Sequence, residues 1–283
     1  MEIRRKIGHR EYGGKMHLKR WVTGLIALPI LIYVIGFSPR WIFYLLLFLA
    51  SLAGLMEFYR IAAPNLPKSI RWSGYLFPLV LFLLIYTGKF YLLPAIIVLL
   101  AVIPMTLLVI LPHSPRLDSP GHVGKGLLGP IYICLPLAML VIMARYPQGN
   151  LWIFFLLAVI FANDTGAFYC GRQFGKHKLH ESLSPGKTWE GAVGGVLSSI
   201  IAALWFLYIL HLHEINFGIL SLVVALSIMG QIGDLAESML KRSHGVKDSG
   251  TILPGHGGVL DRIDGLLFAI PVLYIYFHFC VIG

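Results

Sequence analysis

Carboxylates and cations are concentrated in one stretch near the end of the chain. Residues 230–265 read GQIGDLAESMLKRSHGVKDSGTILPGHGGVLDRIDG. The 31 residues from 234 to 264 include five of the 13 acidic residues in the whole sequence. The acidic residues are Asp234, Glu237, Asp248, Asp261 and Asp264, and the cations between them are Lys241, Arg242, Lys247 and Arg262. A solvated loop can carry such a mixture, so the spacing of the residues has to decide whether it does chemistry.

The spacing favours a site that binds a cation. Asp261 and Asp264 stand three residues apart, and Asp234 and Ser238 stand four apart, so on helices each pair shares a face. Two helix ends that carry carboxylates can converge on a hard divalent cation, and Mg²⁺ is commonly held by one or two carboxylates together with substrate phosphates.

Glycine and arginine complete the set of groups needed for phosphate chemistry. Residues 254–258 read PGHGG, and glycine lets a backbone approach a ligand closely. Arg262 lies between the two aspartates, where it can hold a phosphate or pair with a carboxylate. Carboxylates that bind metal, cationic side chains that bind phosphate and glycines that allow close approach are typical of enzymes of phosphoryl or nucleotidyl transfer. In these reactions catalysis is mainly positioning and charge neutralisation.

A second polar stretch begins inside an apolar run. Asn163 and Asp164 interrupt LAVIFANDTGAFYC, and a carboxylate at membrane depth normally faces a polar cavity or partner. The loop that follows carries glycines and four cations suited to phosphate, namely Arg172, Lys176, Lys178 and Lys187. Gly186-Lys187-Thr188 is not a P-loop, because Glu181 stands where that motif needs glycine. His177 and His180 have no third ligand nearby, so they predict no metal site.

The elements that position these residues are membrane helices. The sequence is 57% hydrophobic and only 13% charged, against roughly 25% charged in an average soluble domain. Because these apolar runs are continuous, we predict an all-α polytopic membrane protein with about nine transmembrane helices. The runs lie near 21–37, 41–56, 73–87, 91–111, 127–144, 151–170, 190–210, 216–233 and 265–282.

The placement of charge predicts the orientation. The segments at 1–20, 57–72, 112–126, 171–189 and 234–264 hold 20 of the 23 Lys and Arg. By the positive-inside rule these segments face the cytoplasm, so we predict a multi-pass protein of the cell membrane whose site opens to the cytoplasm. No contiguous basic domain with a recognition motif is present, which argues against nucleic acid as a partner.

The sequence divides into a basic N-terminus (1–20), a transmembrane scaffold (21–144) and a catalytic region (151–283) with cytoplasmic loops 171–189 and 234–264. Within the scaffold we expect Glu57 and Arg60 to form an interfacial ion pair and 112–126 to be a connector. Three scattered cysteines indicate neither disulfides nor zinc. Gly191 and Gly195 form a G-x-x-x-G pattern typical of close helix packing, and such small-residue faces make a homodimer plausible.

In its two polar stretches, at 163–191 and 238–264, the chain resembles the CDP-diacylglycerol synthases, also called phosphatidate cytidylyltransferases. The resemblance rests on a 27-residue pattern and on a second block from Asn163-Asp164 to Ser184–Gly191. The first pattern consists of Ser238, Leu240, Lys241-Arg242, Lys247-Asp248, Gly250, Leu253-Pro254, His256-Gly257-Gly258, Val259 and Asp261-Arg262-Ile263-Asp264. The N-terminal half resembles the family only in its hydrophobic character.

The resemblance implies Mg²⁺-dependent transfer of CMP from CTP to phosphatidate at the surface of the lipid bilayer. It places the metal at Asp234, Asp261 and Asp264, and the catalytic cations at Lys241 and Arg242. The substrates would be held by Asn163, Asp164, Arg172, Ser184, Lys187, Ser238, Lys247, Asp248, His256, Gly257, Gly258 and Arg262. Two alternatives remain: another CTP-dependent lipid enzyme, of the CDP-archaeol synthase or polyprenol kinase type, and a cation-coupled transporter.

Overall fold

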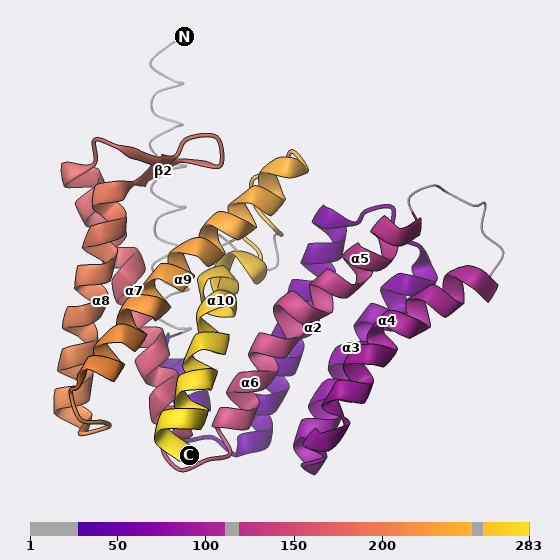
Figure 1. Ribbon diagram of the computed structural model, residues 1–283, viewed down its shortest axis with the longest axis horizontal. Coiled ribbons are helices and arrows are strands. Elements are labelled where there is room, and N and C mark those ends of the chain that lie inside the picture. Colours follow the sequence, from indigo (N-terminus) through magenta and orange to yellow (C-terminus); the bar gives the residue numbers. More distant parts are fainter. Residues whose placement is uncertain (1–27, 111–118, 251–256, 283) are drawn as a thin grey trace, which may run out of the picture.

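A computed structural model describes residues 28–110, 119–250 and 257–282 of the chain. The protein is an all-α polytopic membrane protein with one short β-hairpin (Figure 1). Eight helical segments in the described ranges are long and apolar enough to cross a bilayer, which confirms the last eight predicted spans. The first predicted span, 21–37, begins outside the described residues, and its described part is helical over 28–36.

The elements follow one another in two halves of the chain. The first half contains α2 (Arg40–Ala62), α3 (Lys68–Thr87), a 3₁₀ turn (Phe90–Leu92), α4 (Leu93–Ile110), α5 (Ser119–Gly129), a π-helical turn (Pro130–Cys134) and α6 (Leu135–Met143). The second half contains α7 (Gly149–Phe174), β1 (Lys178–His180), β2 (Ser184–Thr188), α8 (Trp189–Leu210), α9 (Phe217–Ser243), α10 (Leu260–Tyr276) and a π-helical end (Phe277–Ile282).

Three predicted loops are shorter in the structure than the hydrophobic pattern indicates. The connector predicted at 112–126 is helical from Ser119 onward, and its residues 111–118 are outside the described part. The polar loop predicted at 171–189 begins only after Phe174, and the one predicted at 234–264 is helical up to Ser243 and again from Leu260. The helices extend because polar side chains at the end of a span can face a cavity while the backbone keeps its internal hydrogen bonds.

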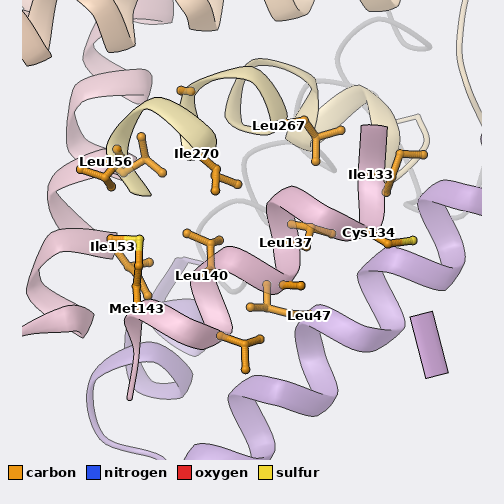
Figure 2. Close-up of a cluster of buried hydrophobic side chains, with 14 of the residues drawn as sticks. Leu47, Ile133, Cys134, Leu137, Leu140, Met143, Ile153, Leu156, Leu267 and Ile270 are labelled. Atoms are coloured by element: carbon orange, nitrogen blue, oxygen red, sulfur yellow. The ribbon is translucent and has the colours of Figure 1, made fainter. Parts of the chain in front are cut away.

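The helices form two groups that meet along α6 and α10. In Figure 1, α7–α9 stand on one side and α2–α5 on the other, with α6 and α10 between them. Figure 2 shows α6 side chains packed among residues of α2, α7 and α10. The labelled members of this apolar cluster are Leu47, Ile133, Cys134, Leu137, Leu140, Met143, Ile153, Leu156, Leu267 and Ile270. All of these side chains are buried, so the two groups share one core.

Candidate active site

A cavity of about 1050 Å³ opens where α7, α9, α10 and the β-hairpin meet. Its volume is at the upper end of ordinary ligand sites, which span roughly 300–1,000 Å³. The carboxylates among its described lining residues are Asp164, Asp234, Glu237, Asp248, Asp261 and Asp264, and the cations are Arg172, Lys187, Lys241 and Arg262. Apolar side chains, including Phe168 and Leu179, line it as well. The cavity therefore combines charged groups with an apolar wall.

Small residues bring α7 and α8 into direct contact. A Cβ atom placed on Gly166 of α7 would lie 2.0 Å from the Ser198 Oγ of α8, and one on Gly191 would lie 2.8 Å from the Ala167 carbonyl oxygen. A Cβ on Gly195 would lie 2.5 Å from the Asn163 Oδ1. The close packing predicted for Gly191 and Gly195 is confirmed, and it takes place within one chain.

Asn163 and Gln231 together connect three helices beside the cavity. Its side chain is fully buried, and its Oδ1 accepts hydrogen bonds from the Ser227 Oγ at 2.6 Å and the Gln231 Nε2 at 2.9 Å. Gln231 also donates to the Ala192 carbonyl of α8. Asn163 thus joins α7 to α9, and Gln231 joins α9 to α8, as polar side chains commonly do between membrane helices.

A second glycine contact places two carboxylates opposite each other. A Cβ on Gly233 of α9 would lie 2.5 Å from the Asp264 carbonyl oxygen, and one on Gly265 of α10 would lie 3.1 Å from the Gly230 carbonyl oxygen. The backbones of α9 and α10 therefore touch at this level. Asp234 and Asp264, each next to one of these glycines, line the same cavity.

Asp164 of α7 joins this pair. The negative charges of Asp164, Asp234 and Asp264 are close enough that each pair repels electrostatically. One cation offsets part of this charge, because the Lys187 Nζ lies 2.6 Å from the Asp234 Oδ2. The three carboxylates come from three different helices, and together they make the inner part of the cavity strongly acidic.

Asp261 has a different environment from its neighbour Asp264. Its Oδ1 accepts a hydrogen bond from the Lys241 Nζ at 2.7 Å, and its Oδ2 accepts from the backbone N–H groups of Ser249 at 2.9 Å and Gly258 at 2.8 Å. Lys241 also forms an ion pair with the buried Glu237. In this arrangement Lys241 links α9 to α10, and Asp261 fixes both ends of the loop that joins these helices.

The hairpin that carries Lys187 is fastened to the start of α8. The Thr188 side chain accepts a hydrogen bond from the Gly191 N–H and so caps the helix. The Glu190 carboxylate accepts from the His177 backbone N–H and lies 2.6 Å from the His177 Nδ1. Figure 1 shows the hairpin lying across the ends of α7 and α8, and Lys187 of this hairpin lines the cavity.

The cavity brings together most of the predicted site residues. Those in its lining are Asn163, Asp164, Arg172, Ser184, Lys187, Asp234, Lys241, Asp248, Gly257, Asp261, Arg262 and Asp264. Ser238, Arg242, Lys247 and Gly258 are not in the lining, and the Arg242 and Lys247 side chains are exposed. His256 lies outside the described residues.

The donor set is compatible with Mg²⁺. Carboxylate oxygens are ligands of the type that this ion prefers, and Asp164, Asp234 and Asp264 supply them in one cavity. Within the described part of the chain, no three His, Cys, Asp or Glu side chains form a complete metal-binding group. Mg²⁺ commonly takes one or two protein carboxylates and completes its shell with water and substrate phosphates.

Sequence reasoning missed Glu57. The predicted ion pair with Arg60 is wrong, because the Glu57 carboxylate is buried and accepts hydrogen bonds from Ser249, Val259 and Leu260 instead. A signal was available, since Glu57 is the one acidic residue between positions 28 and 110 of the sequence. A lone carboxylate in so apolar a region needs a buried partner.

Comparison with known proteins identifies relatives of this chain. The sequence profile of the cytidylyltransferase family matches residues 18–280. A phosphatidate cytidylyltransferase of Staphylococcus epidermidis is 48% identical over 128 residues, which are 45% of this chain and 49% of that protein. One from Staphylococcus aureus is 45% identical over the same shares of both chains.

A third relative comes from Bacillus subtilis. This phosphatidate cytidylyltransferase is 46% identical over 126 residues, which are 44% of this chain and 47% of the relative. The chain spans about half the length of the curated relatives it matches.

Proposed function

We propose a function from the premise that this chain belongs to the cytidylyltransferase family: it transfers CMP from CTP to phosphatidate, giving CDP-diacylglycerol and pyrophosphate. The printed names of the Staphylococcus and Bacillus relatives support phosphatidate as the acceptor. The observation that carries the proposal is the single cavity in which carboxylates from α7, α9 and α10 face cations from α7 and the hairpin.

The cavity suits two anionic substrates that arrive from different phases. CTP is water-soluble, whereas phosphatidate stays in the leaflet. The cavity lies at the ends of membrane-spanning helices, and its lining includes Phe168 and Leu179 beside the charged groups. A nucleotide can therefore enter along the polar rim while the lipid headgroup reaches the same space from the bilayer.

In the proposed reaction, a phosphate oxygen of phosphatidate attacks the α-phosphorus of CTP. A new phosphorus–oxygen bond forms, the bond from the α-phosphorus to its bridging oxygen breaks, and pyrophosphate leaves with that electron pair. The phosphate is already an anion near neutral pH, so the main barrier is repulsion between charged groups. Arg172, Lys187 and Arg262 would hold the phosphates, and Lys187 is positioned for this by its ion pair with Asp234.

Mg²⁺ bound at this site would neutralise charge on the triphosphate and on the leaving pyrophosphate. Asp234 and Asp264 would hold the ion, with Asp164 and Asp261 beside them. Asp261 has a second task, because its oxygens accept hydrogen bonds from Lys241, Ser249 and Gly258 and so hold the glycine-rich loop against α10. Arg242, Lys247, Ser238, Asp248 and His256 stay predictions as substrate contacts.

We also propose that the cavity opens on the cytoplasmic side of the cell membrane. The hairpin and the loop between α9 and α10 belong to the set of segments that holds 20 of the 23 Lys and Arg, and such segments stay on the inner side. CTP is supplied on that side. A homodimer stays a prediction, and the glycines that suggested it pack within the chain.

Substitution of Asp264, a proposed metal ligand, and of Asp261 beside it tests this function. We expect Asp264→Asn and Asp261→Asn each to lower Mg²⁺-dependent formation of CDP-diacylglycerol by more than about 10²-fold. Asp264→Asn would weaken binding of the Mg²⁺ that offsets repulsion between the phosphates, and Asp261→Asn removes the negative charge that pairs with Lys241. Purified variants are assayed with CTP, phosphatidate and a range of Mg²⁺ concentrations. Glu214→Gln, an exposed residue between α8 and α9, is the matched control. Full activity in both aspartate variants would remove these residues from the proposed site.

A further inference from the structure

We infer that Glu57 of α2 is a positioning residue, whose buried carboxylate holds the α9–α10 loop and the first turn of α10 in the geometry that the active site needs. The inference rests on the proposed function. The described lining of the cavity comes entirely from residues 163–264. Glu57 would therefore give the apolar first half of the chain a part in shaping a cavity that this half does not line.

The Glu57 carboxylate binds three hydrogen-bond donors. Its Oε1 accepts from the Val259 backbone N–H at 3.0 Å, and its Oε2 accepts from the Leu260 backbone N–H at 2.8 Å and from the Ser249 Oγ at 3.1 Å. Glu57 is 3% exposed. The N–H groups at the start of a helix have no partner within that helix, so a carboxylate at this place satisfies them and interacts favourably with the helix dipole.

The loop is shaped around this carboxylate. A Cβ on Gly250 would lie 2.4 Å from the Glu57 Oε1, and a Cβ on Gly258 would lie 2.4 Å from the Oε2. Any other residue at either position would collide with the carboxylate. The two glycines therefore explain how the backbone on both sides of residues 251–256 approaches a side chain from α2.

Ser249 carries the effect of Glu57 to the cavity. Its Oγ donates to Glu57 and accepts from the Asp261 N–H at 3.3 Å, while its own N–H donates to the Asp261 Oδ2. Asp261 in turn bonds Lys241 of α9. Glu57 thus sets the position of Asp261 through one shared hydroxyl, and Asp264 follows one helical turn later on the same helix.

A neutral amide cannot replace the carboxylate. Glutamine offers one oxygen acceptor, and its amide nitrogen would face donors from the backbone. At least one of the three donors would then lose its partner in a buried place, where an unmade hydrogen bond is costly. Because the affected donors lie at the loop and at the start of α10, the loss would displace the residues that position the substrates and leave their binding groups intact.

The experiment compares Glu57→Gln with Glu57→Asp, Ser249→Ala and the control Glu214→Gln in the purified full-length protein. Steady-state rates with CTP and phosphatidate give kcat and KM, and hydrogen exchange reports on the amides of residues 257–264. We expect Glu57→Gln to lower kcat by about 10-fold to 100-fold, with KM for CTP changed by less than about 3-fold, and to speed exchange at Val259 and Leu260 by roughly 10-fold or more. Glu57→Asp keeps the charge, so we expect its kcat and its exchange rates at Val259 and Leu260 to lie between those of the wild type and those of Glu57→Gln.

Ser249→Ala provides a second variant, which removes one hydrogen bond to Glu57 and one from the Asp261 N–H, so it tests the same relay if Glu57→Gln does not fold. We expect it to lower kcat by about 3-fold to 10-fold, and the double variant to lose less than the product of the two single losses. Wild-type kcat in both single variants, or unchanged exchange at residues 257–264, overturns the inference. A wild-type protein that forms no CDP-diacylglycerol refutes the proposed function instead, and the exchange measurement then still tests the role of Glu57.

Discussion

Replacing Gly233 by alanine tests whether the contact between α9 and α10 sets the catalytic geometry. The substitution adds one methyl group at the point where the two backbones touch, and it removes no charged group from the cavity. The added Cβ would lie 2.5 Å from the Asp264 carbonyl oxygen, whereas ordinary contacts begin at 3.4 Å. The helices must therefore separate by close to the missing 0.9 Å, because a backbone carbonyl cannot swing aside as a flexible side chain does.

The expected effect on activity is larger than the effect on stability. A displacement of about 1 Å between groups that position substrate can lower a rate by roughly 10²-fold. Overpacking of a helix contact costs about 1–3 kcal/mol, and alanine recovers roughly 0.5–1 kcal/mol through its better helix propensity. We therefore expect Gly233→Ala to fold with a stability lowered by at most about 2.5 kcal/mol and with kcat lowered by about 10²-fold.

The assay follows CDP-diacylglycerol formed from labelled CTP, and thermal unfolding in detergent reports stability. Gly124→Ala is the matched control, because it makes the same change in helix α5 at a position where an added Cβ has no atom within 4 Å. We expect this control to keep wild-type kcat. If Gly233→Ala also keeps wild-type kcat and unfolds as Gly124→Ala does, the argument that this contact positions Asp234 and Asp264 is refuted.

Two further predictions concern charge and helix association. Lys187→Met should raise KM for CTP by about 10-fold or more, because Lys187 lines the cavity and is the cation paired with Asp234. The exposed Lys89→Met should leave KM unchanged; equal kinetics in the two variants would exclude Lys187 from the site. Asn163→Leu should lower the free energy of unfolding by about 1–3 kcal/mol, since it removes the acceptor for both Ser227 and Gln231 and membrane hydrogen bonds are each worth about 0.6–1.7 kcal/mol. Denaturation by a graded detergent series measures this loss against Ser51→Ala, whose hydroxyl bonds only within its own helix.

The membrane architecture could be predicted from the sequence because hydropathy reports directly on length and continuity of spans. The last eight predicted spans correspond to helices, but some helices extend into the polar segments beyond the predicted span ends. Asp234 and Lys241 belong to α9, although their charge made them look like loop residues. Hydropathy cannot separate a solvated loop from a helix end that faces a polar cavity, and that distinction depends on neighbouring helices.

The site was predictable in its composition and less so in its internal connections. The carboxylates at 234, 261 and 264 and the cations at 187, 241 and 262 do line one cavity. The spacing of Asp261 and Asp264 indicated a shared face and equal roles, whereas the structure gives Asp261 three hydrogen-bond donors from α9 and the loop. Glu57 lies 203 positions before its partner Leu260, and no local pattern can reveal a contact across that separation.

The most direct test of the central claim follows the fate of the CTP phosphates. Purified protein is incubated with phosphatidate and Mg²⁺ and with CTP that carries ³²P at either the α- or the γ-position, and the lipid product is extracted. CMP transfer predicts that the α-label enters the lipid, that the γ-label leaves in pyrophosphate, and that both depend on Mg²⁺. Label from the γ-position in the lipid would indicate a CTP-dependent kinase, and no label from either position would contradict the proposed activity altogether.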